Sequence, residues 1–74
     1  MVVLVKSDDW QGLYINNKLW EEGHHIEFST IIDGCKKNGV DVSDLEEVWV
    51  SENYQEKLED MGNFPNLYDE VEVE

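Results

Sequence analysis

The first apolar stretch of the chain is short, continuous and rich in β-branched residues. It runs from Val2 to Val5 and ends at the polar segment Lys6-Ser7-Asp8-Asp9. A run of this length, bounded by turn residues, is typical of a buried strand. The sequence therefore predicts a buried strand at its start, followed by a turn at Asp8-Asp9.

Residues 10–22 have the pattern of a β-hairpin. Apolar residues flank Asn16-Asn17 on both sides, and asparagine tolerates the positive φ that a two-residue hairpin turn requires at both central positions. Gly12 is a candidate site for a β-bulge. A turn at this point predicts three cross-strand pairs, which are Ile15 with Lys18, Tyr14 with Leu19, and Leu13 with Trp20.

The stretch after the hairpin predicts an amphipathic helix. Thr30 is a candidate N-cap, because Asp33 follows it at the spacing of a capping box. Gly39 is placed to end the helix. Apolar residues recur at i, i+3, i+4 and i+7. The face that they form comprises Phe28, Ile31, Ile32 and Cys35.

A second helix is predicted from Glu52 to Met61. Ser51 precedes it as an N-cap, and Gly62 follows it as a C-cap. Its apolar stripe, at i, i+4 and i+7, comprises Tyr54, Leu58 and Met61.

The remaining apolar segments predict one more strand and an alternating tail. Glu47 to Val50 alternates too little for a half-exposed strand and is predicted to be mostly buried. Tyr68 to Glu74 alternates valine with glutamate, which fits either an edge strand or a frayed end. The tryptophans Trp10, Trp20 and Trp49 are expected in the core. These elements predict a single α+β domain, residues 1–74, with a small, mainly antiparallel sheet of three to five strands and two helices packed on it.

The charge of the chain is concentrated in its second half. The net charge is −13, and residues 41–74 hold twelve carboxylates against one cation, Lys57. A one-signed field of this strength destabilises a fold by self-repulsion and attracts cationic partners. The chain contains no arginine, the residue best suited to clamp phosphate. We therefore expect no direct binding to nucleic acid.

The carboxylates of the predicted second helix recur one turn apart, or about 5.4 Å of rise. Such a row can stand in for the phosphates of a nucleic-acid backbone, and the alternative is an ordinary solvated helix face. Two of the acids lie at the C-terminal end of the helix, where the helix dipole disfavours them, and this favours a functional role. The phosphate-like row comprises Glu52, Glu56, Glu59 and Asp60, and the acids that extend its field are Glu46, Glu47, Asp69, Glu70 and Glu72.

Catalytic and metal chemistry finds little support in the sequence. His24 and His25 are adjacent, so in an extended chain they point to opposite sides and do not share an ion. The acidic segment from Asp41 lacks the ligand at position 5 and the glycine at position 6 of a calcium loop. Cys35 lies on the predicted apolar helix face and is expected to be a buried structural thiol. We therefore predict no catalytic residue, no metal and no cofactor, and expect a protein that is not an enzyme.

The same features bear on localisation. A single cysteine excludes an internal disulfide and fits a reducing compartment. The run from Met1 to Val5 is too short for a signal peptide and lacks a basic start. No apolar run approaches the ~18 residues of a membrane span. The expected location is the cytoplasm, with no membrane association.

Short motifs near both ends resemble those of small proteins encoded by tailed bacteriophages. Near the start they are Trp10-x-Gly12-Leu13-Tyr14-Ile15, Lys18-Leu19 and Glu22-Gly23-His24, and near the end they are Gly62-Asn63-Phe64-Pro65 and Leu67. In size and acidity the chain is similar to host-takeover proteins of lytic Bacillus phages, a group that includes a DNA mimic that blocks the nucleoid protein HU. The resemblance implies a non-enzymatic inhibitor that acts in the host cytoplasm, at the nucleoid.

The acidic second half supports two functional hypotheses. In the first, the acidic face binds a basic host DNA-binding protein of the HU type and excludes DNA by competition. In the second, the chain is a small phage structural or regulatory domain that binds through an aromatic patch, and its acids serve only solubility. Salt separates the two, because electrostatic binding weakens steeply with ionic strength. The oligomeric state stays open, a homodimer included.

Overall fold

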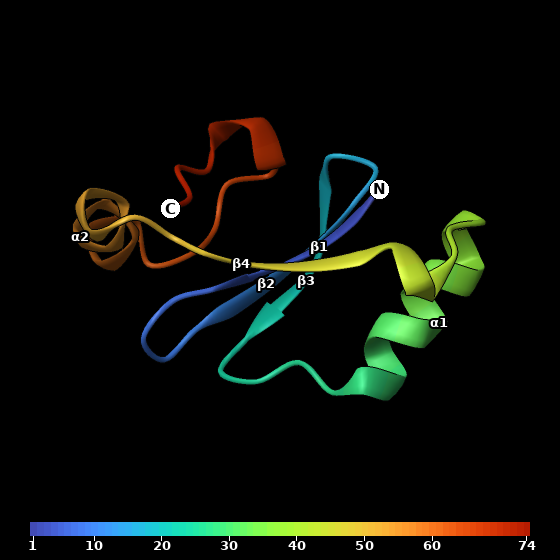
Figure 1. Ribbon diagram of the computed structural model, residues 1–74. Helices are drawn as coiled ribbons and strands as arrows, with labels where there is room; N and C mark the ends of the chain where they lie inside the picture. The colour runs from blue at the N-terminus through green and yellow to red at the C-terminus, as the bar shows by residue number, and fades with distance from the viewer.

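Four strands form one mixed sheet in the computed structural model, which describes residues 1–74 (Figure 1). Their order across the sheet is β3-β2-β1-β4. β1 pairs antiparallel with β2, β2 pairs antiparallel with β3, and β1 pairs parallel with β4. The predicted α+β class, with a mainly antiparallel sheet and two helices, is confirmed. The strands are β1 (Val2–Lys6), β2 (Gln11–Ile15), β3 (Lys18–Gly23) and β4 (Leu45–Trp49).

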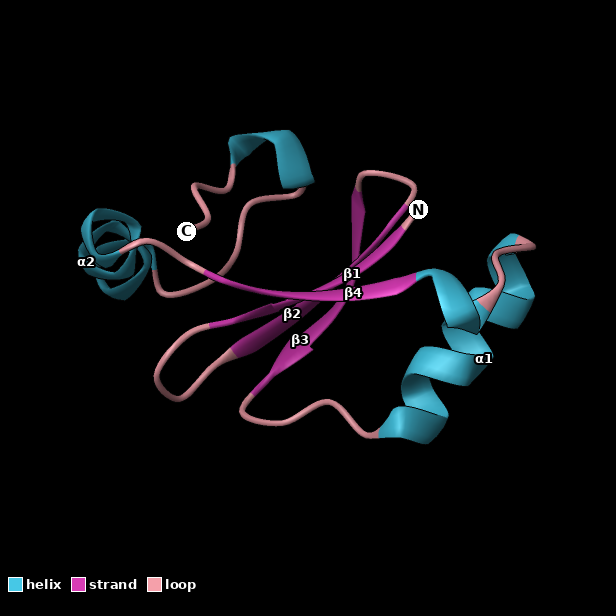
Figure 2. Cartoon of the chain, in the orientation of Figure 1, coloured by secondary structure: helices cyan, strands magenta, loops and turns pink.

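The sheet lies between two helical layers (Figure 2). α1 (Phe28–Asn38) packs on one face, and α2 (Glu52–Met61) packs on the other together with the C-terminal segment. β3 and β4 run in the same direction, so the chain has to cross the sheet between them, and α1 is that crossover. One short 3₁₀ helix, Val42–Asp44, precedes β4, and another, Tyr68–Glu70, lies in the C-terminal segment.

The hairpin between β2 and β3 turns at Asn16-Asn17, as predicted. These residues have φ angles of 52° and 72°, the left-handed values that this turn requires. The two predicted pairs nearest the turn form, but Leu13 pairs with Glu21 instead of Trp20. Trp20 is therefore the extra residue of a β-bulge in β3. The sequence pattern places the bulge at Gly12. It cannot indicate that the extra residue lies on the partner strand, at Trp20.

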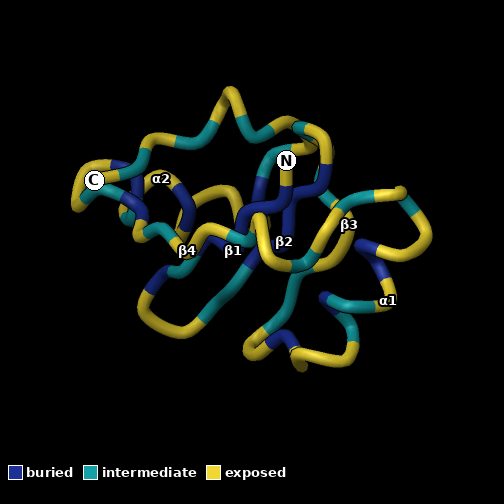
Figure 3. The backbone as a smooth tube through the Cα atoms, turned by 45° about the vertical axis from the view of Figure 1, so that its right-hand side comes forward, coloured by how far each residue is buried: buried dark blue, intermediate teal, exposed yellow.

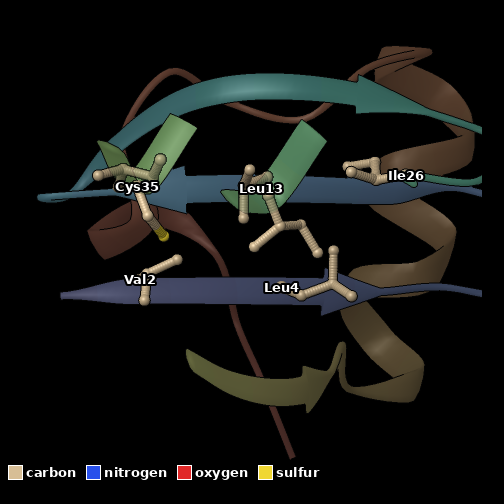
Figure 4. Packing of buried hydrophobic residues seen from close by; sticks show 7 residues of the cluster. Val2, Leu4, Leu13, Ile26 and Cys35 are labelled. Carbon is tan, nitrogen blue, oxygen red and sulfur yellow. The ribbon is translucent and has the colours of Figure 1, made fainter. Parts of the chain in front are cut away.

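The α1 side of the sheet buries the first of two hydrophobic clusters (Figure 4). Alternate residues of β1 and β2 point to this side and meet Ile31 and Cys35 of α1. Cys35 is buried, as predicted, and its burial raises the pKa of the thiol. The first cluster comprises Val2, Leu4, Leu13, Ile15, Ile26, Ile31 and Cys35.

The opposite side buries the second cluster, which α2 and the C-terminal segment cover. Tyr54 and Leu58 of α2 pack with Phe64 and with Tyr14 of β2. The Tyr14 hydroxyl donates a hydrogen bond to the Pro65 carbonyl at 2.6 Å. Because both sides carry a cluster, the two central strands are almost entirely buried (Figure 3). The second cluster comprises Val3, Val5, Tyr14, Val50, Tyr54, Leu58 and Phe64.

α1 begins before the predicted N-cap. Its N-cap is Glu27, whose side chain makes no capping hydrogen bond, and Thr30 lies inside the first turn. The buried Ile26 fixes the chain on the first cluster directly before the helix, so packing decides the start. Phe28 is consequently 58% exposed, contrary to the prediction. The helix ends as predicted at Gly39, with φ of 66°.

α2 has the predicted bounds. The Ser51 side chain accepts a hydrogen bond from the Tyr54 N–H at 3.2 Å, and Gly62 ends the helix with φ of 78°. Tyr54 and Leu58 are buried as predicted, but Met61 is 48% exposed. The second cluster reaches along α2 only to Leu58, so Met61 lies outside it.

β4 is an edge strand and not the mostly buried one predicted. Only β1 lies beside it in the sheet, and its side chains are exposed or half-buried. Trp49 at its end is 50% exposed, and Trp20 on the other edge strand is 43% exposed. The expectation that both belong to the core is therefore wrong. An edge strand has a neighbour on one side only, and the sequence pattern does not record which strands are edges.

The C-terminal segment is ordered and touches both edges of the sheet. Leu67 bridges Lys18 of β3, and Val73 bridges Val50 just after β4, both antiparallel. The Glu74 N–H donates to the Trp49 carbonyl at 2.9 Å. The tail is predicted to be either an edge strand or a frayed end. The structure has the edge-strand geometry, limited to the single bridge between Val73 and Val50.

Gly12 is expected to be intolerant of substitution, although it lies in regular pairing and not in the predicted bulge. A Cβ there would lie 2.7 Å from the ring of the buried Phe64, while nothing lies within 4 Å of a Cβ at Gly23. Gly12→Ala should lower the free energy of unfolding by about 1–3 kcal/mol through overpacking. Gly23→Ala, the matched control, should change it by less than about 0.5 kcal/mol. Urea denaturation measures both, and equal losses would contradict the close contact with Phe64.

Candidate functional site

The outer surface of α2 carries the predicted row of carboxylates. Tyr54 and Leu58 point into the second cluster. Successive residues are about 100° apart around the helix axis, so the four acidic side chains of the row point, on average, to the side of the helix opposite Tyr54 and Leu58. No ion pair or side-chain hydrogen bond involves any of the four. The exposed row comprises Glu52, Glu56, Glu59 and Asp60.

A groove of about 400 Å³ opens at the N-terminal end of α2. Carboxylates from three separate segments line it, with Trp49 among them. Half of the Trp49 surface is exposed, so the groove combines negative charge with an accessible aromatic ring. We call it the acidic groove, and its residues are Asp8, Trp49, Val50, Glu52, Gln55, Glu56 and Glu74.

The parallel pairing of β1 with β4 assembles the acidic groove. Lys6 lies opposite Trp49 in the register, so the loop after β1 and the helix after β4 leave the sheet at the same end. The Val50 N–H donates to the Lys6 carbonyl at 3.1 Å, and the Glu74 N–H donates to the Trp49 carbonyl. These backbone bonds bring the three acidic segments together independently of their side chains.

Five of the seven residues of the acidic groove are missing from the predicted site, and three of the five are charged or aromatic. The sequence pattern places Asp8 in a turn, Trp49 in the core and Glu74 at the end of an alternating tail. The parallel pairing of β1 with β4 brings all three together, so the groove could be predicted only by predicting that pair. Residues 6 and 49 are far apart in sequence, and no local pattern marks such a pair.

A smaller hollow of about 140 Å³ lies beside the C-terminal half of α2. Glu59 of α2 and Asp9 of the loop after β1 both line it, together with Trp10 and Leu58. The loop after β1 therefore adds a carboxylate to each of the two hollows that flank α2. The acidic surface is not confined to the second half of the chain.

The two acids of β4 that were predicted to extend the field point to opposite sides of the sheet. Neighbours in a strand alternate, so Glu46 shares the α2 side with the partly buried Val48. Glu47 lies on the α1 side, where its carboxylate is 2.7 Å from the Lys6 Nζ. Glu47 is therefore separated from the α2 row.

The three predicted acids of the C-terminal segment have different surroundings. Asp69 lies at the β2–β3 turn, where its N–H donates to the Asn17 Oδ1 at 3.1 Å. The Glu72 carboxylate lies 3.7 Å from the Lys57 Nζ of α2. Burial raises the pKa of Tyr54, and the negative charges of Glu70 and Glu72 raise it further. Glu70 and Glu72 therefore lie close to α2, whereas Asp69 belongs to the far end of the sheet.

The exposed aromatic side chains are distributed over different surface features. Trp20 lies against Gly34 of α1, Phe28 lines a groove at the start of α1, and Trp49 lines the acidic groove. Tyr68 is half-buried, with its ring centroid 5.5 Å from that of Tyr14. An aromatic docking patch would need these rings on one surface.

The site combines negative charge with an exposed aromatic ring. No group of three histidine, cysteine, aspartate or glutamate side chains is placed to hold a metal ion. Neither helix is long and apolar enough to cross a membrane. Comparison with protein-family models, with curated proteins and with solved structures gave no match.

The acids at the two ends of α2 are expected to affect stability differently. Glu52 lies in the first turn, where the helix dipole favours a negative charge, and Glu59 and Asp60 lie in the last turn, where it does not. At low salt, Glu59→Gln with Asp60→Asn should raise the free energy of unfolding. Glu52→Gln with Glu56→Gln should raise it less, because the favourable dipole interaction of Glu52 is lost.

Urea denaturation at low salt and at about 1 M salt, where the Debye length is about 3 Å, measures both double variants. The difference between them should shrink at high salt. An equal rise for the two pairs would mean that general repulsion outweighs the helix dipole.

Proposed function

We propose that the protein is a non-enzymatic inhibitor that binds a basic, DNA-binding host protein and excludes DNA from it by competition. The binding surface is the acidic groove together with the outer row of α2. The observation that carries the proposal is the position of Trp49, half-exposed among the carboxylates of three chain segments.

The acidic groove suits the side chain of a lysine or an arginine. A cation over the face of an indole ring is attracted by the ring quadrupole, and carboxylates accept charge-assisted hydrogen bonds from the same group. No ion pair within the chain occupies the four carboxylates of the groove. A cation of the partner would therefore meet them without displacing another. The four are Asp8, Glu52, Glu56 and Glu74.

The row on α2 extends this surface in the manner of a nucleic-acid strand. From Glu52 to Asp60 the helix rises about 12 Å, a length that spans three to four phosphates at about 3.4 Å of axial rise per strand. A protein surface built to hold phosphates presents lysine and arginine at comparable spacing. Such a surface is the complement of the row.

The net charge of −13 supports the same function at long range. It repels DNA and steers basic proteins toward the chain, which raises the association rate and makes it sensitive to salt. The resemblance to phage host-takeover proteins points to an HU-type nucleoid protein in the host cytoplasm. The chemistry of the groove itself supports a partner surface that presents lysine or arginine.

The protein is expected to displace a DNA duplex from an HU-type nucleoid protein without binding the duplex itself. A variant with Asp8→Asn, Glu52→Gln, Glu56→Gln and Glu74→Gln should inhibit about tenfold less strongly or worse, because four ion pairs with the partner are lost. Fluorescence anisotropy of a labelled duplex measures the displacement. Inhibition by the unmodified protein should fall steeply as salt is raised.

A matched control removes the same number of charges elsewhere. Glu21→Gln, Asp33→Asn, Asp41→Asn and Asp44→Asn change exposed residues that do not line the acidic groove, and this variant should keep most of the inhibition. Equal loss from both variants would mean that net charge matters and the groove does not. Full inhibition by both, abolished instead by Trp20→Ala, would favour the aromatic-patch hypothesis.

A further inference from the structure

The outer side of β4 carries unpaired backbone groups. The Val50 N–H bonds inward to the Lys6 carbonyl at 3.1 Å, so by alternation Leu45, Glu47 and Trp49 direct their backbone groups away from β1. The Trp49 carbonyl accepts the Glu74 N–H at 2.9 Å. No hydrogen bond from a turn, a loop or the C-terminal segment reaches Glu47. Its N–H and C=O therefore face solvent.

The C-terminal segment demonstrates that this edge accepts a strand. Val73 bridges Val50 in antiparallel fashion, and the Ser51 N–H donates to the Glu72 carbonyl at 3.0 Å. This pairing occupies the edge only as far as Trp49. At Glu47 the edge is open, and at Leu45 only the carbonyl is free, because the Leu45 N–H donates to the Val42 carbonyl.

A groove of about 380 Å³ runs beside the open part of the edge, on the α1 side. Leu45 and Glu47 of β4 line it together with Leu4 of β1 and Phe28 of α1, and Phe28 is 58% exposed. A residue added beside Leu45 would place an apolar side chain over this groove. On the other side of the strand the exposed Glu46 carboxylate has no ion-pair partner.

We propose that an extended segment of the basic partner adds to the sheet as a strand along β4. Its side chains alternate, apolar ones over Leu45 and Phe28 and basic ones beside Glu46. This inference rests on the proposed function and specifies how the partner docks, with backbone hydrogen bonds supplementing the attraction between charges.

Charge selects a basic segment over a second copy of the chain. Two β4 strands side by side would bring the Glu46 and Glu47 carboxylates of both copies together, and like charges across a strand pair are destabilising. Each copy also carries a net charge of −13. A lysine-rich strand meets the Glu46 carboxylate, which has no ion-pair partner within the chain, with the opposite sign.

The test uses a synthetic peptide of about ten residues that alternates lysine and valine. A second peptide of the same sequence has N-methyl groups on alternate backbone nitrogens and keeps every charge. Amide hydrogen exchange of the Glu47 N–H, followed by NMR, should slow when the first peptide binds. The methylated peptide should bind about tenfold more weakly, because it cannot donate the strand-pairing bonds.

Two variants of one residue separate the backbone from the charge. Glu47→Pro removes the outward N–H, and proline is tolerated on an edge strand where its nitrogen faces solvent. Glu47→Gln removes the carboxylate and its ion pair with Lys6 but keeps the N–H. Glu47→Pro should weaken peptide binding about tenfold, and Glu47→Gln by much less. If circular dichroism finds Glu47→Pro unfolded, the comparison of the two peptides decides.

Three outcomes would overturn the strand addition. One is equal affinity for both peptides with unchanged exchange at Glu47, which leaves the proposed function to be decided by DNA displacement. Another is failure of both peptides to bind at low salt. The third is protection of the Glu47 N–H without peptide that grows with protein concentration, which would assign the edge to a second copy of the chain.

Discussion

The parallel pairing of β1 with β4 is the contact on which the surface of this protein depends. It sets the loop after Lys6 and the helix after Val50 at one end of the sheet. An antiparallel β4 would send its C-terminal end, and α2 with it, to the opposite end of the strands, about 16 Å away for five residues. Asp8 would then lie apart from Glu52 and Glu56. The direction of β4, and not the number of acids, determines where on the surface the negative charge concentrates.

The two hydrophobic clusters make this concentration of charge tolerable. Each side of the sheet buries its own cluster, and the carboxylates of the acidic groove are absent from both. The ion pairs of Lys6 with Glu47 and of Lys57 with Glu72 lie outside the groove as well. Repulsion within the groove therefore remains uncompensated in the isolated chain, which is the usual form of a conflict between stability and function.

Local chemistry made part of this structure predictable. Asn16-Asn17 specifies its turn, and Ser51 and Gly62 specify the ends of α2, because each acts on backbone atoms a few residues away. The extra residue at Trp20 and the exposure of Trp49 depend on neighbours distant in sequence, and alternation of residue types does not encode them. The acid row of α2 was predictable from its period, whereas Asp8 could join the site only through strand direction.

The composition of the acidic groove has an evolutionary consequence. Its carboxylates stand on exposed positions whose backbone is held by hydrogen bonds of the sheet and by buried apolar residues. Aspartate and glutamate can replace one another there, and an acid can move by a turn of α2, with little change in the field at the groove. Under the proposed function, selection would act on the sum of these charges, so lineages could exchange individual acids while the buried framework changes slowly. Trp49 has no such substitute within the groove, and among the groove residues it is the one whose identity selection would fix.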